Sequence, residues 1–443
     1  MPLGLGYIIS ATEVNGFTVD VVNCASFINS FHPDDFEILD VCLRSALSDY
    51  SPLLIGVGPC ITTQLKALMV ISKTCKDMFP NTAIVCGGPL ATMHDQEWVF
   101  FEMLGVDYII KGDGEEAITN LLATLKSGKR AIDCDNVSYL GHTIVNEIAD
   151  INNIRFPSRT IANDMQISLR RQDKTKEQIT FPMITSRGCM YRCAYCVSGS
   201  LPYCNFRKRN YGNIINEMKR LKEEFGATDV IFYDDCFFYN PRIANNDIRD
   251  FCTLLLDHNI NMSWQMELRT DLILSIDEQS IELLEEAGCR QINIGIEKTT
   301  DENLRNIGKT SSVRGLQERN KIIVERSNIQ LTGTFILGGP GETEASTQQL
   351  ISSAQELYLT EAHFSPLFLY PGTKLYIDMG YDARKWVSLI MNDTYPWGEI
   401  VYENEFLTRE KLLDLEQIAY EEFYKGKDHA YADAYLDRYN LRR

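Results

Sequence analysis

The chain has 443 residues, with 43 Lys and Arg against 61 Asp and Glu, so its formal net charge at pH 7 is −18. A charge of this sign repels polyanions and argues against a nucleic acid partner that is held mainly through its phosphates. No apolar run approaches the ~20 residues of a membrane-spanning helix, and the start MPLGLGYIIS lacks the basic segment of a secretion signal. We therefore expect a cytoplasmic protein with no membrane partner, whose 13 cysteines stay reduced.

The first part of the chain alternates strand-like and helix-like segments, a pattern that predicts a parallel sheet with helices on its faces. We expect helices at 33–47 and 62–79, the second with a threonine cap, and strands at 17–24, 52–60, 82–89 and within 106–118. Residues 1–127 are thus predicted to form a Rossmann-like domain. Glycines follow three of the strands, at the edge where open α/β sheets bind ligands; they are Gly58, Gly87, Gly88, Gly112 and Gly114.

Residues 128–178 are polar and weakly periodic, and we interpret them as a connector. The alternation resumes in 179–377, where six strands are expected at 181–188, 229–236, 261–268, 291–297, 330–338 and 362–370. Helical patterns lie between them at 211–226, 244–259, 276–288, 310–327 and 343–359. Six strand–helix units predict a partial (β/α)6 barrel, short of the eight units of a TIM barrel. Residues 378–443 are expected to form a helical cap, with the strongest helical period at 407–426 after a threonine cap.

The segment TSRGCMYRCAYC follows the first barrel strand and places three thiols at C-x-x-x-C-x-x-C spacing: Cys189, Cys193 and Cys196. Thiolates suit zinc or an iron–sulfur cluster. A structural zinc site needs a fourth ligand, which Cys204 could supply. An iron–sulfur cube on three thiolates leaves one iron open for a cofactor or substrate. The basic segment CNFRKRN, 204–210, is either a solvated loop or a clamp for a small anion.

The pattern C-x-x-x-C-x-aromatic-C after the first strand of a partial barrel resembles the radical S-adenosylmethionine (radical SAM) superfamily. The resemblance implies a [4Fe-4S] cluster on the three cysteines, with its open iron chelated by S-adenosyl-L-methionine (SAM). It further implies one-electron cleavage of SAM to a 5′-deoxyadenosyl radical, and an external electron donor such as flavodoxin or ferredoxin.

Four later segments, IFYDDCFFYN, MELRTDLI, INIGIEKTTDENLRNIGKT and TFILGGPGETEAS, resemble successive strands of the same family. By this resemblance, nine residues are expected to bind SAM: Tyr195, Asp234, Asp235, Arg269, Glu297, Gly338, Gly339, Gly341 and Glu342. Two simpler interpretations stay open. Tyr195 could be a core aromatic, and Arg269 could form an ion pair with an acidic neighbour.

Segments of residues 2–118 resemble the cobalamin-binding domain that precedes the barrel in one subgroup of this family, which implies that the five glycines lie against cobalamin. Subgroup members open with a strand before PLGLGYI, so either the true start lies upstream of Met1 or the sheet lacks its first strand. The resemblance implies cobalamin-dependent C-methylation of an unactivated carbon in a small-molecule or natural-product intermediate. One alternative is a radical SAM cyclase, epimerase or other rearrangement enzyme without cobalamin, in which Cys204 or Cys236 donates hydrogen. The other is a non-catalytic iron–sulfur or cobalamin-binding protein.

Overall fold

The computed structural model describes residues 3–27, 35–93, 97–129, 134–139, 145, 147–159, 178–201, 205–309, 311–395 and 398–427. The chain divides into two compact units. Unit 1 comprises Met1–Gln166, Ser200–Asn205 and Tyr370–Ile400, and unit 2 comprises Ile167–Gly199, Phe206–Leu369 and Val401–Arg443. In the described residues, every helix is too short or too polar to cross a membrane.

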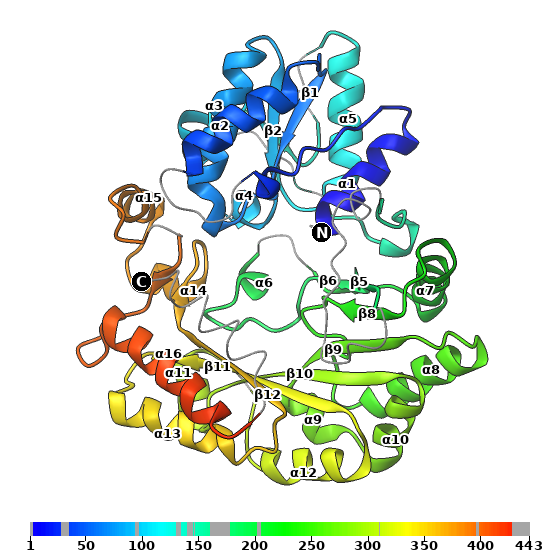
Figure 1. The fold of residues 1–443 in the computed structure, drawn as a ribbon, viewed down its shortest axis with the longest axis vertical. Helices are drawn as coiled ribbons and strands as arrows, with labels where there is room; N and C mark the ends of the chain where they lie inside the picture. The colour runs from blue at the N-terminus through cyan, green and yellow to red at the C-terminus, as the bar shows by residue number, and fades with distance from the viewer. Residues whose placement is uncertain are drawn as a thin grey trace. The chain divides into compact units, whose positions relative to one another are not determined.

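Unit 1 is built on a four-stranded sheet with the strand order β1-β2-β3-β4. Strands β1 (Leu54–Val57), β2 (Ala83–Gly87) and β3 (Tyr108–Ile110) are parallel, and β4 (Val137–Ser138) runs antiparallel to β3. Figure 1 shows helices on both sides of this sheet. They are α1 (Leu3–Val14), α2 (Asp35–Leu47), α3 (Leu65–Met78), α4 (Pro89–Met93) and α5 (Glu115–Lys126). The parallel α/β prediction for this part of the chain is confirmed.

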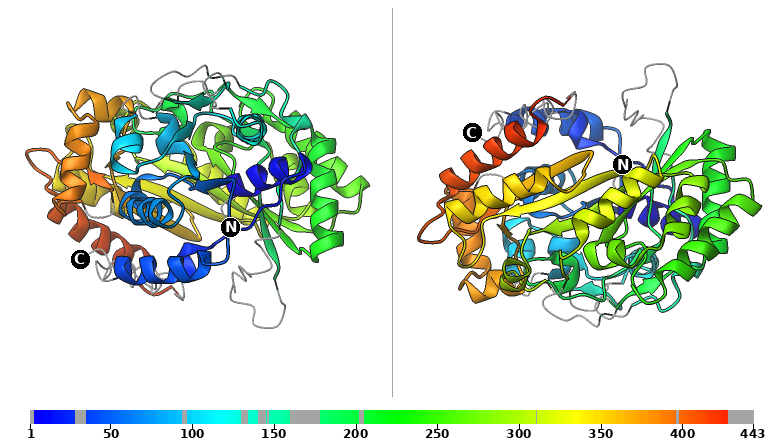
Figure 2. Two further views of the ribbon diagram at one scale, coloured as in Figure 1. Left: turned by 90° about the horizontal axis from the view of Figure 1, so that it is seen from above. Right: turned by 90° about the horizontal axis from the view of Figure 1, so that it is seen from below.

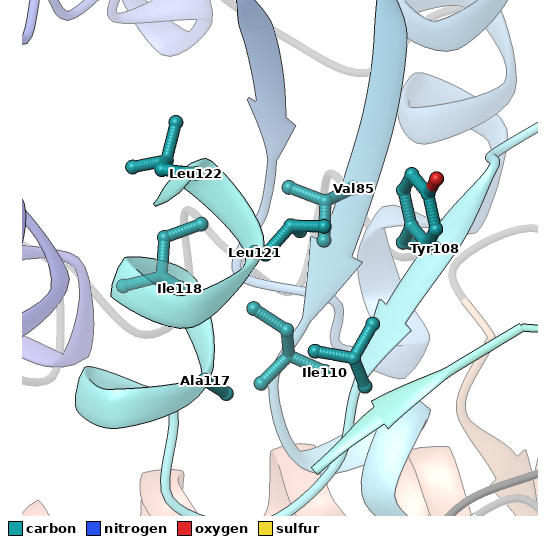
Figure 3. Packing of buried hydrophobic residues seen from close by; sticks show 8 residues of the cluster. Val85, Tyr108, Ile110, Ala117, Ile118, Leu121 and Leu122 are labelled. Carbon is teal, nitrogen blue, oxygen red and sulfur yellow. The ribbon is translucent and has the colours of Figure 1, made fainter. Parts of the chain in front are cut away.

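The core of unit 1 lies between the sheet and helix α5. Val85, Tyr108 and Ile110 point from the strands toward α5 (Figure 3). On helix α5, the residues that pack against them share one helical face: Ala117, Ile118, Leu121 and Leu122. Each fully buried aliphatic side chain stabilises the fold by roughly 1.5–3 kcal/mol relative to an exposed one. This face therefore fixes where the acidic first turn of α5 lies, next to the glycine-ended loops.

Two local predictions for unit 1 were wrong, and one helix was not predicted. Residues 17–24 form no strand and lead into a short 3-10 helix at Cys24–Ser26. Strand β1 is the edge of the sheet on that side within the described residues, and residues 17–24 do not add a strand to it. Residues Leu3–Val14 are helical although no helix was expected. Helix α3 begins after Gln64 with no side-chain cap, so the predicted threonine cap is absent.

Unit 2 contains a six-stranded, all-parallel sheet with the order β12-β11-β10-β9-β8-β5. Its strands are β5 (Thr180–Met183), β8 (Asp229–Phe232), β9 (Ser263–Arg269), β10 (Cys289–Glu297), β11 (Gln330–Leu337) and β12 (Glu361–Pro366). Each overlaps a predicted segment, and strands that follow one another in this series are also neighbours in the sheet. The partial barrel is therefore confirmed, with β5 and β12 at its open edges.

Helices follow the barrel strands on one side of the sheet (Figures 1 and 2). They are α7 (Tyr211–Phe225), α8 (Ala244–Asp257), α9 (Thr270–Ser275), α10 (Glu278–Glu286), α11 (Asp301–Asn306), α12 (Leu316–Arg326), α13 (Glu344–Gln355) and α16 (Arg409–Tyr424). The predicted threonine cap of α16 is confirmed, since the Thr408 side chain accepts a hydrogen bond from the Lys411 amide. The remaining elements are β6 (Ser186–Arg187), α6 (Val197–Ser200), β7 (Arg207–Lys208), β13 (Phe368–Leu369), α14 (Lys374–Asp378), α15 (Ala383–Met391) and β14 (Ile400–Val401).

The two faces of the barrel sheet differ sharply in polarity. The helix-covered outer face carries buried apolar side chains; Trp264 there contacts Phe251 of α8, and Phe364 contacts Tyr420 of α16. Alternate residues point the other way. We call this the inner face; on the four strands β9–β12 it includes Gln265, Glu267, Arg269, Gln291, Asn293, Gly295, Thr332, Thr334, Ile336, Glu361, His363 and Ser365.

Candidate functional site

The three cysteines lie in one loop whose two ends are held together. Strand β6 pairs with β7 in antiparallel register, and the Arg209 amide donates to the Thr185 carbonyl at 2.8 Å. Within the loop, the Cys196 amide donates to the Cys193 carbonyl at 3.1 Å, which forms a tight turn. All three thiols are half-buried. The loop leaves the carboxyl end of β5, so it lies at the barrel edge where (β/α) enzymes place their active sites.

The thiols are close enough to influence one another's ionisation. Burial raises the pKa of Cys189 to about 11, with smaller contributions from Asp235 and the other two thiols. Burial also raises the pKa of Cys196. Cys189 and Cys196 are therefore protonated in the metal-free chain, and a metal group must displace their protons when it binds.

The donor set fits an iron–sulfur cube better than one zinc ion. Zinc needs four ligands around a single point. Within the described ranges, no three His, Cys, Asp or Glu side chains are so arranged, and Cys204 lies outside those ranges. A cube spreads three thiolates over three irons, and three neighbouring half-buried thiols on one loop are the donors that it requires.

Asp234 clamps the base of the cysteine loop. One of its carboxylate oxygens accepts hydrogen bonds from the Thr185 amide (2.9 Å), the Thr185 hydroxyl (3.0 Å) and the Ser186 hydroxyl (2.5 Å). Burial raises the pKa of Asp234 to about 6, although these hydrogen bonds act in the opposite direction. The neighbouring Asp235 is exposed and accepts from the Ser198 hydroxyl at 2.5 Å. The two adjacent carboxylates thus have different roles. Asp234 holds the cysteine loop through hydrogen bonds, whereas the Asp235 side chain is exposed.

Arg269, the last residue of β9, joins the barrel to the cysteine loop. Its Nη1 lies 3.9 Å from Cys193 Sγ as a hydrogen-bond donor. Its guanidinium lies over the Tyr191 ring, 3.6 Å from the centroid, and its Nε donates to Asp271 at 3.1 Å. The arginine therefore forms the simple ion pair that the sequence left open and contacts the triad as well.

Glu297 is the last residue of β10, and its backbone adopts a left-handed conformation with φ at 68°. Its carboxylate accepts from Lys309 Nζ at 3.1 Å. Desolvation raises the pKa of Tyr195 well above its ordinary value, and the nearby Glu297 carboxylate raises it further. Behind the loop, a Cβ on Gly308 would lie 2.8 Å from Ala194 Cβ, so glycine is needed there for close approach. The structure thus brings Tyr195 and Glu297 together, as residues from separate motifs.

The glycine-containing loop after β11 is held by hydrogen bonds from a buried lysine, Lys298. Lys298 Nζ donates to the carbonyls of Ile336 (2.7 Å) and Gly338 (2.6 Å) and pairs with Glu342 at 2.8 Å. Gly338, Gly339 and Gly341 all have positive φ, which glycine adopts without strain. Glu342 is therefore held in an ion pair within the loop. The sequence analysis did not identify Lys298. Its position directly after Glu297, at the end of a predicted strand, was the only indication in the sequence.

In unit 1, the five predicted glycines lie at the carboxyl edge of β1–β3. A Cβ on Gly88 would lie 2.8 Å from the Cys60 amide nitrogen, and one on Gly114 would lie 2.7 Å from Ile8 Cδ1. Gly58 and Gly87 also lie close together, since a Cβ on Gly58 would meet the Gly87 carbonyl at 3.3 Å. At Gly112, an added Cβ would lie 3.2 Å from Val145 Cγ1. The chain's own atoms thus pack closely against these glycines, and contact of the five glycines with cobalamin stays a prediction.

Other candidate residues have structural partners. Cys236 is buried, its Sγ lies 2.9 Å from the Phe238 carbonyl, and burial raises its pKa to about 12. In the basic segment, Arg209 forms a buried pair with Glu217 at 2.6 Å, and Lys208 Nζ faces four aromatic rings. At least two of its basic side chains are thus used inside the fold, which weakens the anion-clamp interpretation.

Sequence analysis also missed Glu267, which shares the inner face of β9 with Arg269. It is exposed, yet the surrounding protein raises its pKa to about 7 by desolvation, with contributions from Asp235, Asp234 and Glu297. The segment NMSWQMEL does contain the glutamate, but only the strand register shows that it belongs to the inner face.

Comparison with protein families agrees with both units. The model of the radical SAM superfamily matches residues 183–354, and the model of the B12 binding domain matches residues 1–122. These ranges contain the cysteine triad and the glycine-ended sheet, respectively.

Three similar proteins span most of the chain. An uncharacterized methyltransferase of Pyrococcus horikoshii is 25% identical over 441 residues, which cover 96% of this chain and 87% of that protein. The radical SAM methyltransferase TsrM of Kitasatospora setae, solved with tryptophan and a SAM analogue, aligns at 22% identity with a TM-score of 0.65, over 85% of this chain and 72% of that one. The cobalamin-dependent SAM radical enzyme OxsB, solved with aqua-cobalamin and SAM, aligns at 15% identity with a TM-score of 0.70, over 100% of this chain and 69% of that one.

Proposed function

Because the chain belongs to the radical SAM superfamily and carries a B12 binding domain at its N-terminal end, we propose that it is a cobalamin-dependent C-methyltransferase. Its substrate is a small molecule with an unactivated carbon, and the electron comes from an external donor such as flavodoxin or ferredoxin. The observation that carries the proposal is the clamped loop of three half-buried thiols at the carboxyl edge of a partial barrel. The alignment with a methyltransferase over 96% of this chain supports the methyl-transfer outcome.

Cys189, Cys193 and Cys196 would hold the [4Fe-4S] cluster, and the glycine edge of unit 1 would hold cobalamin. When bound, these groups and SAM supply one electron, a 5′-deoxyadenosyl radical and a transferable methyl group. The chain's own contribution is to bind, orient and exclude water. Asp234 and Arg269 hold the cysteine loop to the barrel.

The other inner-edge residues are proposed to bind SAM. Asp235 and Glu297 offer carboxylates at the ends of neighbouring barrel segments, which suit the amino and hydroxyl donors of SAM. An added Cβ at Gly341 would meet no atom within 4 Å, so the backbone at Gly341 is proposed to face the adenosine. The buried Lys298–Glu342 pair supports this backbone from behind, so Glu342 would act by positioning the loop.

The test is anaerobic reconstitution of the full chain with iron, sulfide and hydroxocobalamin, followed by reduction in the presence of SAM. We expect both 5′-deoxyadenosine and S-adenosylhomocysteine, the latter in an amount comparable to the bound cobalamin. The Cys193→Ala variant should lose the 5′-deoxyadenosine. Deoxyadenosine without S-adenosylhomocysteine would instead support the rearrangement alternative, and the absence of both products would support a non-catalytic binding protein.

A further inference from the structure

Four polar residues form one level across the inner face of the barrel sheet. Glu267 of β9 pairs in register with Asn293 of β10, Asn293 pairs with Thr332 of β11, and Thr332 pairs with Glu361 of β12. Parallel barrels normally fill their interior with layers of branched apolar side chains. A polar level in this position costs free energy of desolvation unless its groups find partners. The question is therefore which of these polar groups find partners within the chain.

Most members of this level already have partners within the sheet. Gln291 Nε2 donates to Asn293 Oδ1 at 2.9 Å and to Thr332 Oγ1 at 2.8 Å. The Thr332 hydroxyl in turn donates to Glu361 at 3.3 Å. These contacts link β10, β11 and β12 into one hydrogen-bonded row. Glu267 stands outside the row, because its side chain makes no hydrogen bond or ion pair with any residue in the described part of the chain.

Two basic side chains, Arg269 and Lys309, form contacts with groups other than Glu267. Arg269, two residues further along β9, is held by Asp271, Tyr191 and Cys193. Lys309 is bound to Glu297 and the Gly295 carbonyl. The groups that influence the Glu267 carboxylate electrostatically are three further carboxylates: Asp235, Asp234 and Glu297. Glu267 is thus an exposed acceptor in a negative environment, and no residue that the structure describes gives it a positive partner.

Glu267 also lies close to the reacting region in the fold. Residues two apart on a strand share a face and differ by about 6.6 Å along it. Glu267 is therefore one level below Arg269, whose guanidinium contacts Cys193 of the triad. A molecule held by Glu267 occupies the inner face directly below the cysteine loop.

We propose that Glu267 is a substrate-binding carboxylate and that the substrate carries a protonated amine at the position this residue recognises. The inference rests on the proposed function and extends it by naming the substrate class. A carboxylate without a cationic partner, among other carboxylates, favours a positive ligand over a neutral alcohol, because an ammonium adds the attraction of opposite charges to the hydrogen bond that both ligands can donate. Asn293 lies at the same level, and its amide oxygen could accept a hydrogen bond from the bound ammonium.

The test uses paired probes that differ only in charge: perdeuterated n-hexylamine and 2-phenylethylamine against n-hexanol and 2-phenylethanol. The reconstituted holoenzyme is incubated with SAM, reductant and each probe, and deuterium in 5′-deoxyadenosine is measured by mass spectrometry. We expect deuterium from an amine and none from its alcohol. The Glu267→Gln variant should lose this transfer, whereas Glu267→Asp should retain part of it. Glu286→Gln, an exposed helix position, controls for overall charge.

Calorimetry on the purified chain gives a readout that does not depend on turnover. An amine should bind at least ten-fold more tightly than its alcohol to the wild type and to Glu286→Gln, and Glu267→Gln should abolish this preference. Equal affinities for all pairs, or a preference that survives in Glu267→Gln, would overturn the proposal. A raised Kd for SAM in Glu267→Gln would also overturn it, because the carboxylate would then serve the cofactor. If the proposed function fails, deoxyadenosine is absent while the calorimetric preference remains.

Discussion

The central carbon of the Arg269 guanidinium lies 3.6 Å from the centroid of the Tyr191 ring, so the end of β9 is stacked on the cysteine loop. Tyr191 is itself fixed, since its hydroxyl donates to the Tyr239 carbonyl at 3.1 Å. With the hydrogen bond from Nη1 to Cys193 Sγ, this stack joins the loop to the third strand of the barrel. The geometry of the thiols thus depends on a residue 76 positions away in sequence.

Replacing Arg269 should impair cluster assembly more than folding. Arg269→Lys keeps the charge but loses the planar group that stacks on Tyr191 and reaches both Asp271 and Cys193. Residues that orient metal ligands typically change metal affinity by about 10–100-fold when they are mutated. We expect iron and sulfide per chain to fall in Arg269→Lys and further in Arg269→Gln, with an altered electron paramagnetic resonance signal. Arg326→Gln, on an outer helix, is the control, and equal iron contents in all variants would contradict the prediction.

Asp234 should make stability fall as pH rises through the mildly acidic range. Its folded-state pKa is about 6, above the value of about 3.9 for an unfolded aspartate. The folded state therefore binds the extra proton between these values, and ionisation at higher pH costs up to roughly 3 kcal/mol of stability.

Asp234→Asn should remove this pH dependence while it keeps an oxygen acceptor for Thr185 and Ser186. Urea unfolding of both proteins between pH 4 and 7 is the measurement. The stability of the Asn variant relative to the wild type should rise with pH over this range, and a constant difference would contradict the assignment. Asp234→Ala, which loses the acceptor as well, should be less stable than Asp234→Asn at every pH.

The sequence predicts those features that depend on local pattern. All six barrel strands overlap predicted segments because each carries apolar residues on at least one face and is bounded by turn residues, and the cysteine spacing places the triad directly. What the sequence misses depends on register or on distant partners. Residues 17–24 have strand-like composition, yet they add no strand to the sheet. The inner-face position of Glu267 follows only from its pairing with Asn293. Lys298 is recognisable only once the Gly338 loop is seen above it.

The buried Lys298–Glu342 pair should be sensitive to the loss of one partner. Removing one side of a buried ion pair leaves an uncompensated charge and typically costs about 3–5 kcal/mol. We therefore expect Lys298→Met to destabilise unit 2 by about that amount and to weaken SAM binding, because the Gly338 loop loses its support. The double variant Lys298→Met with Glu342→Gln removes both charges and should recover part of the stability. A double variant less stable than Lys298→Met alone would refute this account.

Gly88 should be needed for the fold of the glycine edge in unit 1. Its φ is 123°, and an added Cβ would lie 2.8 Å from the Cys60 amide nitrogen. Gly88→Ala combines backbone strain of order 1–3 kcal/mol with a backbone clash. We expect reduced hydroxocobalamin per chain, measured by absorbance, and unchanged iron content. Gly16→Ala is the matched control, because Gly16 has φ at 81° and no atom within 4 Å of its added Cβ. Equal cobalamin binding by the two variants would argue that the clash is relieved without cost.

Two tyrosines of α16 complete the open edge of the barrel sheet. The Tyr420 hydroxyl accepts from the Phe364 amide at 3.0 Å and lies 3.1 Å from the Phe364 carbonyl, to which it donates. Tyr424 makes the same pair of contacts with Ala362. An exposed strand edge is a site of unwanted pairing with other chains, and here the hydroxyls occupy the backbone groups that a further strand would use.

Removing these hydroxyls should therefore cost stability and promote association. Tyr420→Phe and Tyr424→Phe each leave a buried amide and carbonyl of β12 without partners, at a cost of about 1–3 kcal/mol. Urea unfolding should show this loss for each variant, and light scattering should show more association in the double variant, since two neighbouring residues of the edge become available. Tyr358→Phe, at an exposed position, should match the wild type in both measurements. If all three single variants unfold alike, water replaces the lost contacts, and α16 then covers the edge by packing alone.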